Sequence, residues 1–354
     1  MTDLRQSSRR SFLKTALLAG AGVTAGACFP SGIAAKSADT KAMGRVSLTA
    51  GDDRAANIFE GLQVFKKEIR QAIGNRRIIL KPNNVSFNNP LACSHVDTLE
   101  AILEFLKSIG KDRVTIAESP SSGSAFEGYE NLGYMKLAKK YNVEFLDIDH
   151  EPHEVLHVIS DEDFHPHATR LSSLLLNRDN FIISSAVMKT HDRVIATLSL
   201  KNIVFGAPVK DVGFHWGVDP KSGIRNDKVI THGGSSRGVN YNLFALAPRL
   251  HPDLAIVDGF QGMEGNGPSS GDPVDHRVAL VGMDWLAVDR VGIELMGIDF
   301  AKMGYLNYCT EAGMGVGDLN RIELIGESIA DHVKTYRLHD NVEKQLNWLK
   351  PMQG

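Results

Sequence analysis

The sequence predicts an α/β fold, in which a mixed or mainly parallel sheet carries helices on both faces. Short apolar runs of strand length alternate along the chain with segments whose apolar residues recur at helical spacing. Four of these apolar runs also close on polar residues, as strands do when their carboxyl ends border a ligand site. A polar, Gly-rich stretch at 205–240 predicts a long loop that caps this edge of the sheet.

The elements follow one another in a regular order. A helix is expected over 58–73, a second over 98–109, where Gly110 ends it, and a third over about 134–141. The segment 150–167 holds five histidines among several acids, which indicates a solvated hairpin more than a metal site. Strands are expected at 77–83, 114–119, 143–148, 181–186, 254–259 and 277–282.

The N-terminus predicts an export signal. Residues 8–14 read SRRSFLK, and a weakly apolar run follows at 15–27. This pattern is typical of a twin-arginine signal, whose translocase exports folded proteins. The run is shorter than the ~20 residues that a membrane-spanning helix needs. We expect a signal peptide over 1–35, a periplasmic or otherwise exported protein, and no transmembrane helix in the mature chain. Cleavage before Cys28 would permit a lipid anchor there, and cleavage after Ala34 or Ala35 is the alternative.

Composition limits the function classes. The whole chain has a net charge of −3 and its leader is basic, so the mature part is more acidic than the whole, which argues against a nucleic-acid partner. Only Cys93 and Cys309 follow the leader, so an iron–sulfur cluster with four thiolates is not expected. The remaining length suits one main domain over 44–330, followed by a C-terminal helical tail over 331–354.

The candidate substrate site lies where strands end. Lys81 and Asn83 close one predicted strand, and Glu118 and Ser119 close the next. Because the carboxyl ends of parallel strands meet at one edge of a sheet, these side chains are expected to hold a small anionic substrate there, together with Asn202.

The candidate catalytic residues are Lys189, His191 and Lys201. The first two follow another strand, and apolar residues alternate up to Lys201, which predicts a half-buried amine at the end of that segment. A half-buried lysine loses its proton readily and can act as base or nucleophile, and histidine can share proton transfer near neutral pH.

Four further residues are candidates for a divalent metal. They are His95 and His215, which lie in polar loops, and Asp258 and Glu264, which flank a Gly-rich turn after a strand. The two carboxylates could equally serve acid–base chemistry or remain solvated in a structural turn. No phosphate-binding glycine pattern is present, and the cofactor stays undetermined.

Several of these motifs together resemble the domain of unknown function 362 family. The motifs are KPN at 81–83, KTH at 189–191, Thr197 with KN at 201–202, the Gly-rich segment that begins at Asp258, and Asp284 with AVD at 287–289. The resemblance covers about residues 45–326. Relatives often carry ferredoxin-type iron–sulfur modules, and without the cysteines for one this chain is similar to a stand-alone exported form.

A smaller pattern is similar to the cofactor site of nickel-pincer lactate racemases. It consists of His191, Lys201 ten residues later, and His215 in the next loop. The resemblance implies a lysine that carries the pincer covalently and a histidine that binds nickel.

The sequence as a whole predicts an exported enzyme of isomerase or lyase type. It would transfer a proton at a carbon next to a carboxylate or carbonyl of a small hydroxy acid or sugar acid. Two alternatives stay open: a non-catalytic periplasmic protein that binds a metal or ligand, and an accessory subunit of an exported redox complex.

Overall fold

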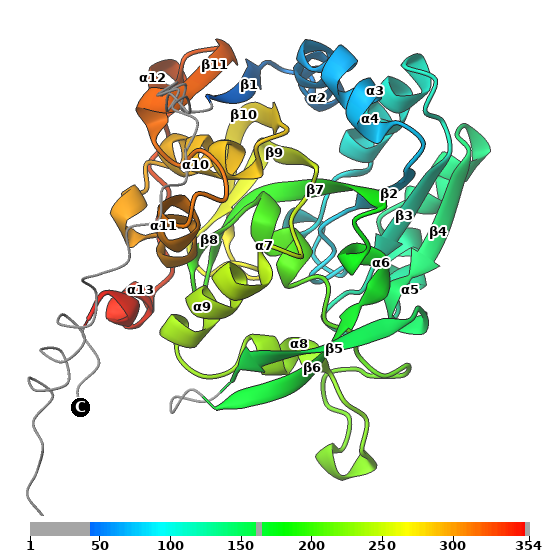
Figure 1. Ribbon diagram of the computed structural model, residues 1–354, viewed down its shortest axis with the longest axis vertical. Helices are drawn as coiled ribbons and strands as arrows, with labels where there is room; N and C mark the ends of the chain where they lie inside the picture. The colour runs from blue at the N-terminus through cyan, green and yellow to red at the C-terminus, as the bar shows by residue number, and fades with distance from the viewer. Residues whose placement is uncertain (1–42, 161–164, 351–354) are drawn as a thin grey trace, which may run out of the picture. The chain divides into compact units, whose positions relative to one another are not determined.

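A single large sheet organises the protein. The computed structural model describes residues 43–160 and 165–350, and within these ranges nine strands form this sheet (Figure 1). Eight of them lie in the order β11-β1-β10-β9-β7-β2-β3-β4, and β8 pairs with β7 outside this order. The strands are β1 (Gly44–Ala50), β2 (Arg77–Lys81), β3 (Val114–Glu118), β4 (Val143–Asp147), β7 (Asn180–His191), β8 (Ile195–Thr197), β9 (Leu254–Glu264), β10 (Asp272–Gly282) and β11 (Ile322–Gly326).

The sheet is mixed and mainly parallel, which confirms the predicted fold class. The neighbours β9, β7, β2, β3 and β4 all pair in parallel, as do β1 and β11. Strand β10 is antiparallel to both of its neighbours, β1 and β9, and β8 is antiparallel to β7. The carboxyl ends of β2, β3, β7 and β9 therefore meet at one edge of the sheet.

Helices cover both faces of the sheet, as the residues of β2 illustrate. Ile78 and Leu80 point into one apolar core, shared with α2 (Arg54–Val64), α3 (Lys66–Ile73) and α4 (Val96–Ser108). Ile79 points to the opposite face and joins a core shared with α7 (Ser199–Val204), α9 (Ser236–Leu246), α10 (Trp285–Leu295) and α11 (Gly304–Glu311). Successive strand residues alternate between faces, so a continuous apolar run needs cover on both sides.

Some predicted elements differ from the structure. The helix expected over 58–73 is two helices, α2 and α3, which meet at Phe65. The helix expected over 134–141 is a 3₁₀ helix, η2 (Tyr134–Lys139), whose buried residues Tyr134 and Leu137 are three positions apart. That spacing suits three residues per turn. Strands β1 and β11 were not predicted from the sequence.

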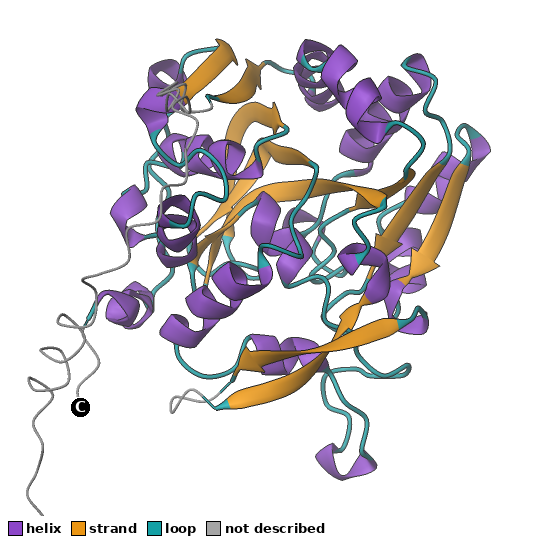
Figure 2. Cartoon of the chain, in the orientation of Figure 1, coloured by secondary structure: helices purple, strands orange, loops and turns teal. Residues whose placement is uncertain are grey.

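The histidine-rich segment forms the expected hairpin. Strands β5 (His153–Ile159) and β6 (Pro166–Ser172) pair antiparallel as a separate two-stranded sheet, drawn apart from the large sheet in Figure 2. The predicted cap over 205–240 contains α8 (Asp227–Thr231) and, from residue 236, the first turn of α9. The remaining α-helices of the described residues are α5 (Ala125–Asn131), α6 (Ser173–Leu176), α12 (Ile329–His332) and α13 (Val342–Gln345). The short 3₁₀ helices are η1 (Pro90–Ala92), η3 (Ile148–His150), η4 (Pro220–Ser222), η5 (Phe300–Lys302), η6 (Leu319–Arg321) and η7 (Leu346–Leu349).

The segment after residue 331 is less helical than expected and reaches back to the end of β7. It is not helical between α12 and α13, and the side chain of Gln345 in α13 is buried. The Gln345 amide nitrogen donates to the His191 carbonyl at 2.9 Å, and its oxygen accepts from the Ile195 amide at 2.6 Å. Ile195 has φ of +68°, a strained conformation for a β-branched residue. Gln345 therefore holds a strained turn in place.

None of the helices within the described part of the chain has the length and apolar character required to cross a bilayer. The predicted signal peptide, with Cys28, lies outside the described residues.

Candidate functional site

A cavity of about 440 Å³ opens at the carboxyl edge of the sheet. The ends of β2, β3 and β7 contribute to its wall, together with β8, α7 and the cap over 205–240. We call it the lysine cavity, because Lys81, Lys201 and Lys228 all line it. It also contains most of the residues that the sequence indicated for catalysis and substrate binding: Lys81, Asn83, Glu118, Ser119, His191, Lys201 and Asn202.

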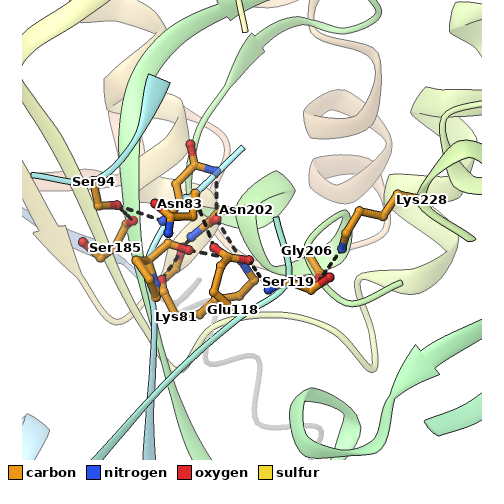
Figure 3. A network of polar contacts seen from close by, with 12 residues as sticks. Lys81, Asn83, Ser94, Glu118, Ser119, Ser185, Asn202, Gly206 and Lys228 are labelled. Carbon is orange, nitrogen blue, oxygen red and sulfur yellow. Dashed lines mark hydrogen bonds and ion pairs between the residues drawn. The ribbon is translucent and has the colours of Figure 1, made fainter. Parts of the chain in front are cut away.

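A buried ion pair between Lys81 and Glu118 lies at the wall of the cavity, and Figure 3 shows the polar contacts around it. Lys81 Nζ donates to both carboxylate oxygens of Glu118, at 2.7 and 2.9 Å, and to the Pro82 carbonyl at 3.1 Å. Glu118 also accepts hydrogen bonds from the backbone amides of Asn84 and Ser119. Because these protein groups already occupy its amine, Lys81 fixes the ends of β2 and β3 and has little capacity left for a substrate.

The amide side chains beside this pair connect three elements. Asn83 Nδ2 donates to Asn202 Oδ1 at 3.1 Å, and Asn202 Nδ2 donates to the Ser184 hydroxyl in β7 at 3.1 Å. Asn83 Oδ1 and the Thr197 hydroxyl are buried and have no hydrogen-bond partner within residues 43–160 and 165–350, although both residues line the cavity. Unpaired buried oxygens at a cavity wall are available to accept hydrogen bonds from a ligand, since a buried acceptor without a hydrogen bond costs free energy.

Lys201 offers the least engaged amine in the cavity. Its Nζ lies 5.0 Å from the centre of the Phe205 ring, and among the described residues it has no hydrogen-bond or ion-pair partner. Burial is the main cause that lowers the pKa of Lys201 to about 7. The charges of Lys189 and Lys81 also lower this pKa, and the charge of Asp192 raises it. A substantial fraction of the amines is therefore neutral at neutral pH, which is the state required of a base or nucleophile.

The helix that carries Lys201 is held by a buried carboxylate. Asp289 in α10 accepts hydrogen bonds from the backbone amides of Ser199 and Leu200, at 2.8 and 3.1 Å, and from the Ser199 hydroxyl at 2.5 Å. These groups begin α7, where amides lack helical partners. Burial raises the pKa of Asp289 to about 7, against the effect of those hydrogen bonds. Asp289 thus fixes the position of Lys201 through the start of α7, without itself lining the cavity.

Two histidines in the cavity have opposite tautomers. His191 Nδ1 accepts from the Arg193 amide at 3.0 Å, so the proton of the neutral ring is on Nε2. His232 Nδ1 lies 2.7 Å from the Lys228 carbonyl, which only accepts, so its proton is on Nδ1 and its Nε2 is an acceptor. Burial, followed by the charge of Lys201, lowers the pKa of His232 to about 3 and that of His191 well below its usual value. The cavity therefore offers one imidazole donor and one imidazole acceptor.

The sequence prediction missed several lining residues, among them the basic side chains of Arg193, Lys228 and His232. Lys228 donates to the carbonyls of Gly206 and Pro208, at 3.2 and 2.6 Å, and burial lowers its pKa to about 7. Lys228 and His232 belong to the predicted cap, so the polarity of that stretch was the available signal.

Lys189 lies outside the lysine cavity. It is fully buried, and its Nζ donates to the Ala92 carbonyl at 2.6 Å. Burial lowers the pKa of Lys189 to about 8. Along β7, the side chains of Lys189 and Thr190 point to opposite faces of the sheet. Adjacent residues of the KTH motif therefore do not contribute to the same site.

The four candidate metal ligands do not form one group. Asp258 accepts from the Thr98 hydroxyl at 2.6 Å and pairs with Arg54 at 3.4 Å. Glu264 accepts from the Arg337 amide at 2.9 Å. His95 caps α4, and burial together with the charge of Arg54 lowers its pKa.

His215 lines a second cavity and is absent from the wall of the lysine cavity. The pattern His191, Lys201, His215 therefore does not gather in one place, and we derive no step through a nickel-pincer cofactor. Within the described ranges, no three His, Cys, Asp or Glu side chains are arranged to hold a metal ion. Cys93 and Cys309 are buried free thiols, and burial raises the pKa of Cys93 to about 11 and that of Cys309 to about 12.

The fold and the cavity together define an α/β protein with a lysine-lined cavity at the carboxyl ends of its strands. The chain belongs to the family described as domain of unknown function 362 (DUF362), whose model matches residues 78–294. This range includes every residue named above as lining the lysine cavity.

One relative is the thylakoid-associated protein sll1697 of Synechocystis sp.. It is 27% identical over 229 residues, which cover 64% of this chain and 65% of the relative. The chain thus spans less than two thirds of the length of that relative.

Proposed function

We propose that this protein is an exported enzyme that transfers a proton at a carbon next to a carboxylate or carbonyl of a small hydroxy acid or sugar acid. The observation that supports this most directly is Lys201: a buried amine that lines the cavity, has no polar partner among the described residues and has a pKa of about 7. Racemases, epimerases, isomerases and lyases share this proton transfer.

The charges of the cavity suit an acidic substrate. Lys81 is paired with Glu118, whereas Lys201 and Lys228 have no carboxylate partner within hydrogen-bond distance in the described part of the chain. A bound carboxylate would lie near these two amines and would favour the charged form of whichever amine it contacts. In this proposal Lys228, assisted by Arg193 at the wall, holds the carboxylate.

The remaining groups complete the proton transfer. Neutral Lys201 removes the proton from the carbon, and Lys228 stabilises the negative charge that then develops on the carboxylate or carbonyl oxygen. The His191 Nε2–H donor and the His232 Nε2 acceptor orient the hydroxyl group of the substrate. The twin-arginine motif at 8–14 supports the exported part of the proposal.

The experiment is hydrogen–deuterium exchange at carbon. The purified protein is incubated in D₂O with single hydroxy acids and sugar acids, and proton NMR follows the loss of the signal of the hydrogen next to the carboxylate. We expect exchange with at least one acid, its loss in Lys201→Ala, and its retention in Lys136→Ala, which replaces an exposed lysine. Exchange that survives Lys201→Ala would contradict the proposed base. Binding of an acid without exchange would favour a periplasmic binding protein.

A further inference from the structure

A second cavity adjoins the lysine cavity. It has a volume of about 750 Å³, and four residues line both cavities: Val85, Ser121, Trp216 and Ser269. Each volume falls within the ~300–1,000 Å³ typical of small-molecule sites. A small hydroxy acid in the lysine cavity would leave the second cavity unused.

The walls of the second cavity are fixed before any ligand arrives. The Ser121 hydroxyl donates to the Val85 carbonyl at 2.6 Å, and the Gly123 amide donates to the Phe214 carbonyl at 3.1 Å. The Trp216 amide donates to the Ser122 hydroxyl at 3.0 Å. The loop after β3 and the cap are thus connected by hydrogen bonds, and a ligand would not have to order them.

The second cavity differs in chemistry from the first. Eight of its thirteen lining residues carry hydroxyl, amide or carboxylate groups, and none of the thirteen is Lys or Arg. Glu127 and Glu130 are both exposed at its wall, which disfavours a second anionic group there. The chemistry therefore suits a neutral ligand with many hydroxyl groups.

Two aromatic rings complete this wall. Trp216 has 62% of its surface exposed, and its ring is supported edge-on by Phe214 at 5.4 Å between centres. The Phe87 ring packs against Gly123 and Gly128, where an added Cβ would approach it to 2.9 and 3.3 Å. A fixed aromatic face beside hydroxyl, amide and carboxylate groups matches a sugar ring, which has apolar C–H faces and a polar rim.

We propose that the natural ligand is an acidic oligosaccharide whose acidic unit lies in the lysine cavity and whose neutral sugar unit lies in the second cavity against Trp216. This inference rests on the proposed function in one respect, since it takes the lysine cavity to be the place of the acid. It adds a second subsite and the class of substrate that spans both.

The test is isothermal titration calorimetry with matched probes. Lactobionate, cellobionate and maltobionate each consist of gluconate joined to a neutral sugar, and gluconate alone and the neutral disaccharides are the comparisons. We expect at least one of the three to bind about tenfold or more tightly than gluconate, a gain of about 1.4 kcal/mol. Trp216→Ala is expected to abolish that gain. Because Trp216 also borders the lysine cavity, the gain is taken as the ratio of the two affinities, for the two-unit acid and for gluconate, measured in the same variant.

The controls separate the two proposals. Trp216→Phe keeps an aromatic face and should retain most of the gain, and Tyr241→Ala, which removes an exposed ring on α9, should retain all of it. If gluconate binds but no two-unit acid binds more tightly, or the gain survives Trp216→Ala, the second subsite is refuted and the acid site stands. If no acid binds, both proposals fail.

Discussion

Replacement of Lys201 by methionine tests whether this amine is held uncharged. Methionine is similar in length, so Lys201→Met removes the charge and keeps most of the packing. The pKa of Lys201 lies near 7 in the folded protein, against an ordinary value of 10.5. At 1.36 kcal/mol for each pKa unit, protonation of this amine costs the folded state up to ~5 kcal/mol.

The sign of the pH dependence follows from proton binding. Between about pH 7 and about pH 10.5 the unfolded chain keeps a proton on Lys201 that the folded chain has lost. The unfolded state therefore binds more protons, and the wild type gains stability as the pH rises, by ~1.4 kcal/mol per pH unit. Lys201→Met lacks this contribution, so it should be more stable than the wild type near pH 7 and should lose most of that advantage near pH 10.

Urea unfolding at both pH values measures this difference. The gap in unfolding free energy between Lys201→Met and the wild type should shrink by about 3 kcal/mol from pH 7 to pH 10. Lys136→Met replaces an exposed lysine, so its difference in unfolding free energy from the wild type should be the same at both pH values. Groups that titrate in the wild type and in both variants cancel in these differences. A gap for Lys201→Met that does not change with pH would refute the inference that burial depresses this pKa.

Three further outcomes are expected. Glu118→Gln should destabilise the fold by about 3–5 kcal/mol in urea unfolding, because Lys81 is left buried and without its ionic partner. A loss of stability under about 1 kcal/mol would contradict this. The double variant Lys81→Met, Glu118→Leu should recover much of the stability. Gly206→Ala should lower the unfolding free energy by about 1–3 kcal/mol or more, since the added Cβ would lie 2.1 Å from Lys81 Cε. Gly238→Ala in α9, where the nearest neighbour of an added Cβ is 3.6 Å away, should be neutral or slightly stabilising. Equal effects of the two substitutions would argue against the close approach at Gly206. Binding of gluconate near pH 8 should take up protons, because the bound carboxylate raises the pKa of Lys228, the amine that holds it, from about 7. Calorimetry in two buffers of different ionisation enthalpy measures this uptake, and no uptake would contradict the proposed contact.

The edge of the sheet that holds the site could be predicted from short-range patterns. Lys81, Glu118 and His191 each end a strand, and parallel strands bring such ends together whatever the order of strands in the sheet. Alternation of apolar residues also predicted a half-buried Lys201, and the structure buries this side chain further. The site therefore follows in part from rules that need only the local sequence.

The rest depends on contacts between distant residues, which no local pattern shows. Asp258 and Glu264 look like free acids in a Gly-rich turn, yet they are bound by Arg54 and by Arg337, which is 73 residues from Glu264. His232 lies in a segment without periodicity, and only the path of the cap brings its ring within 6.2 Å of His191. The order of strands, with β1 and β11 at one side, is likewise a tertiary property.

The contact between Gln345 and the end of β7 joins two parts of the chain that are synthesised far apart in time. Its two partners, His191 and Ile195, precede it by 154 and 150 residues. A ribosome makes the central strand long before it makes the side chain that fixes the strained turn at Ile195, and contacts so far apart in sequence form late. A nascent or proteolytically clipped chain without residues 341–345 would hold the sheet but leave that turn unsupported, so loss of ligand binding should precede loss of the fold.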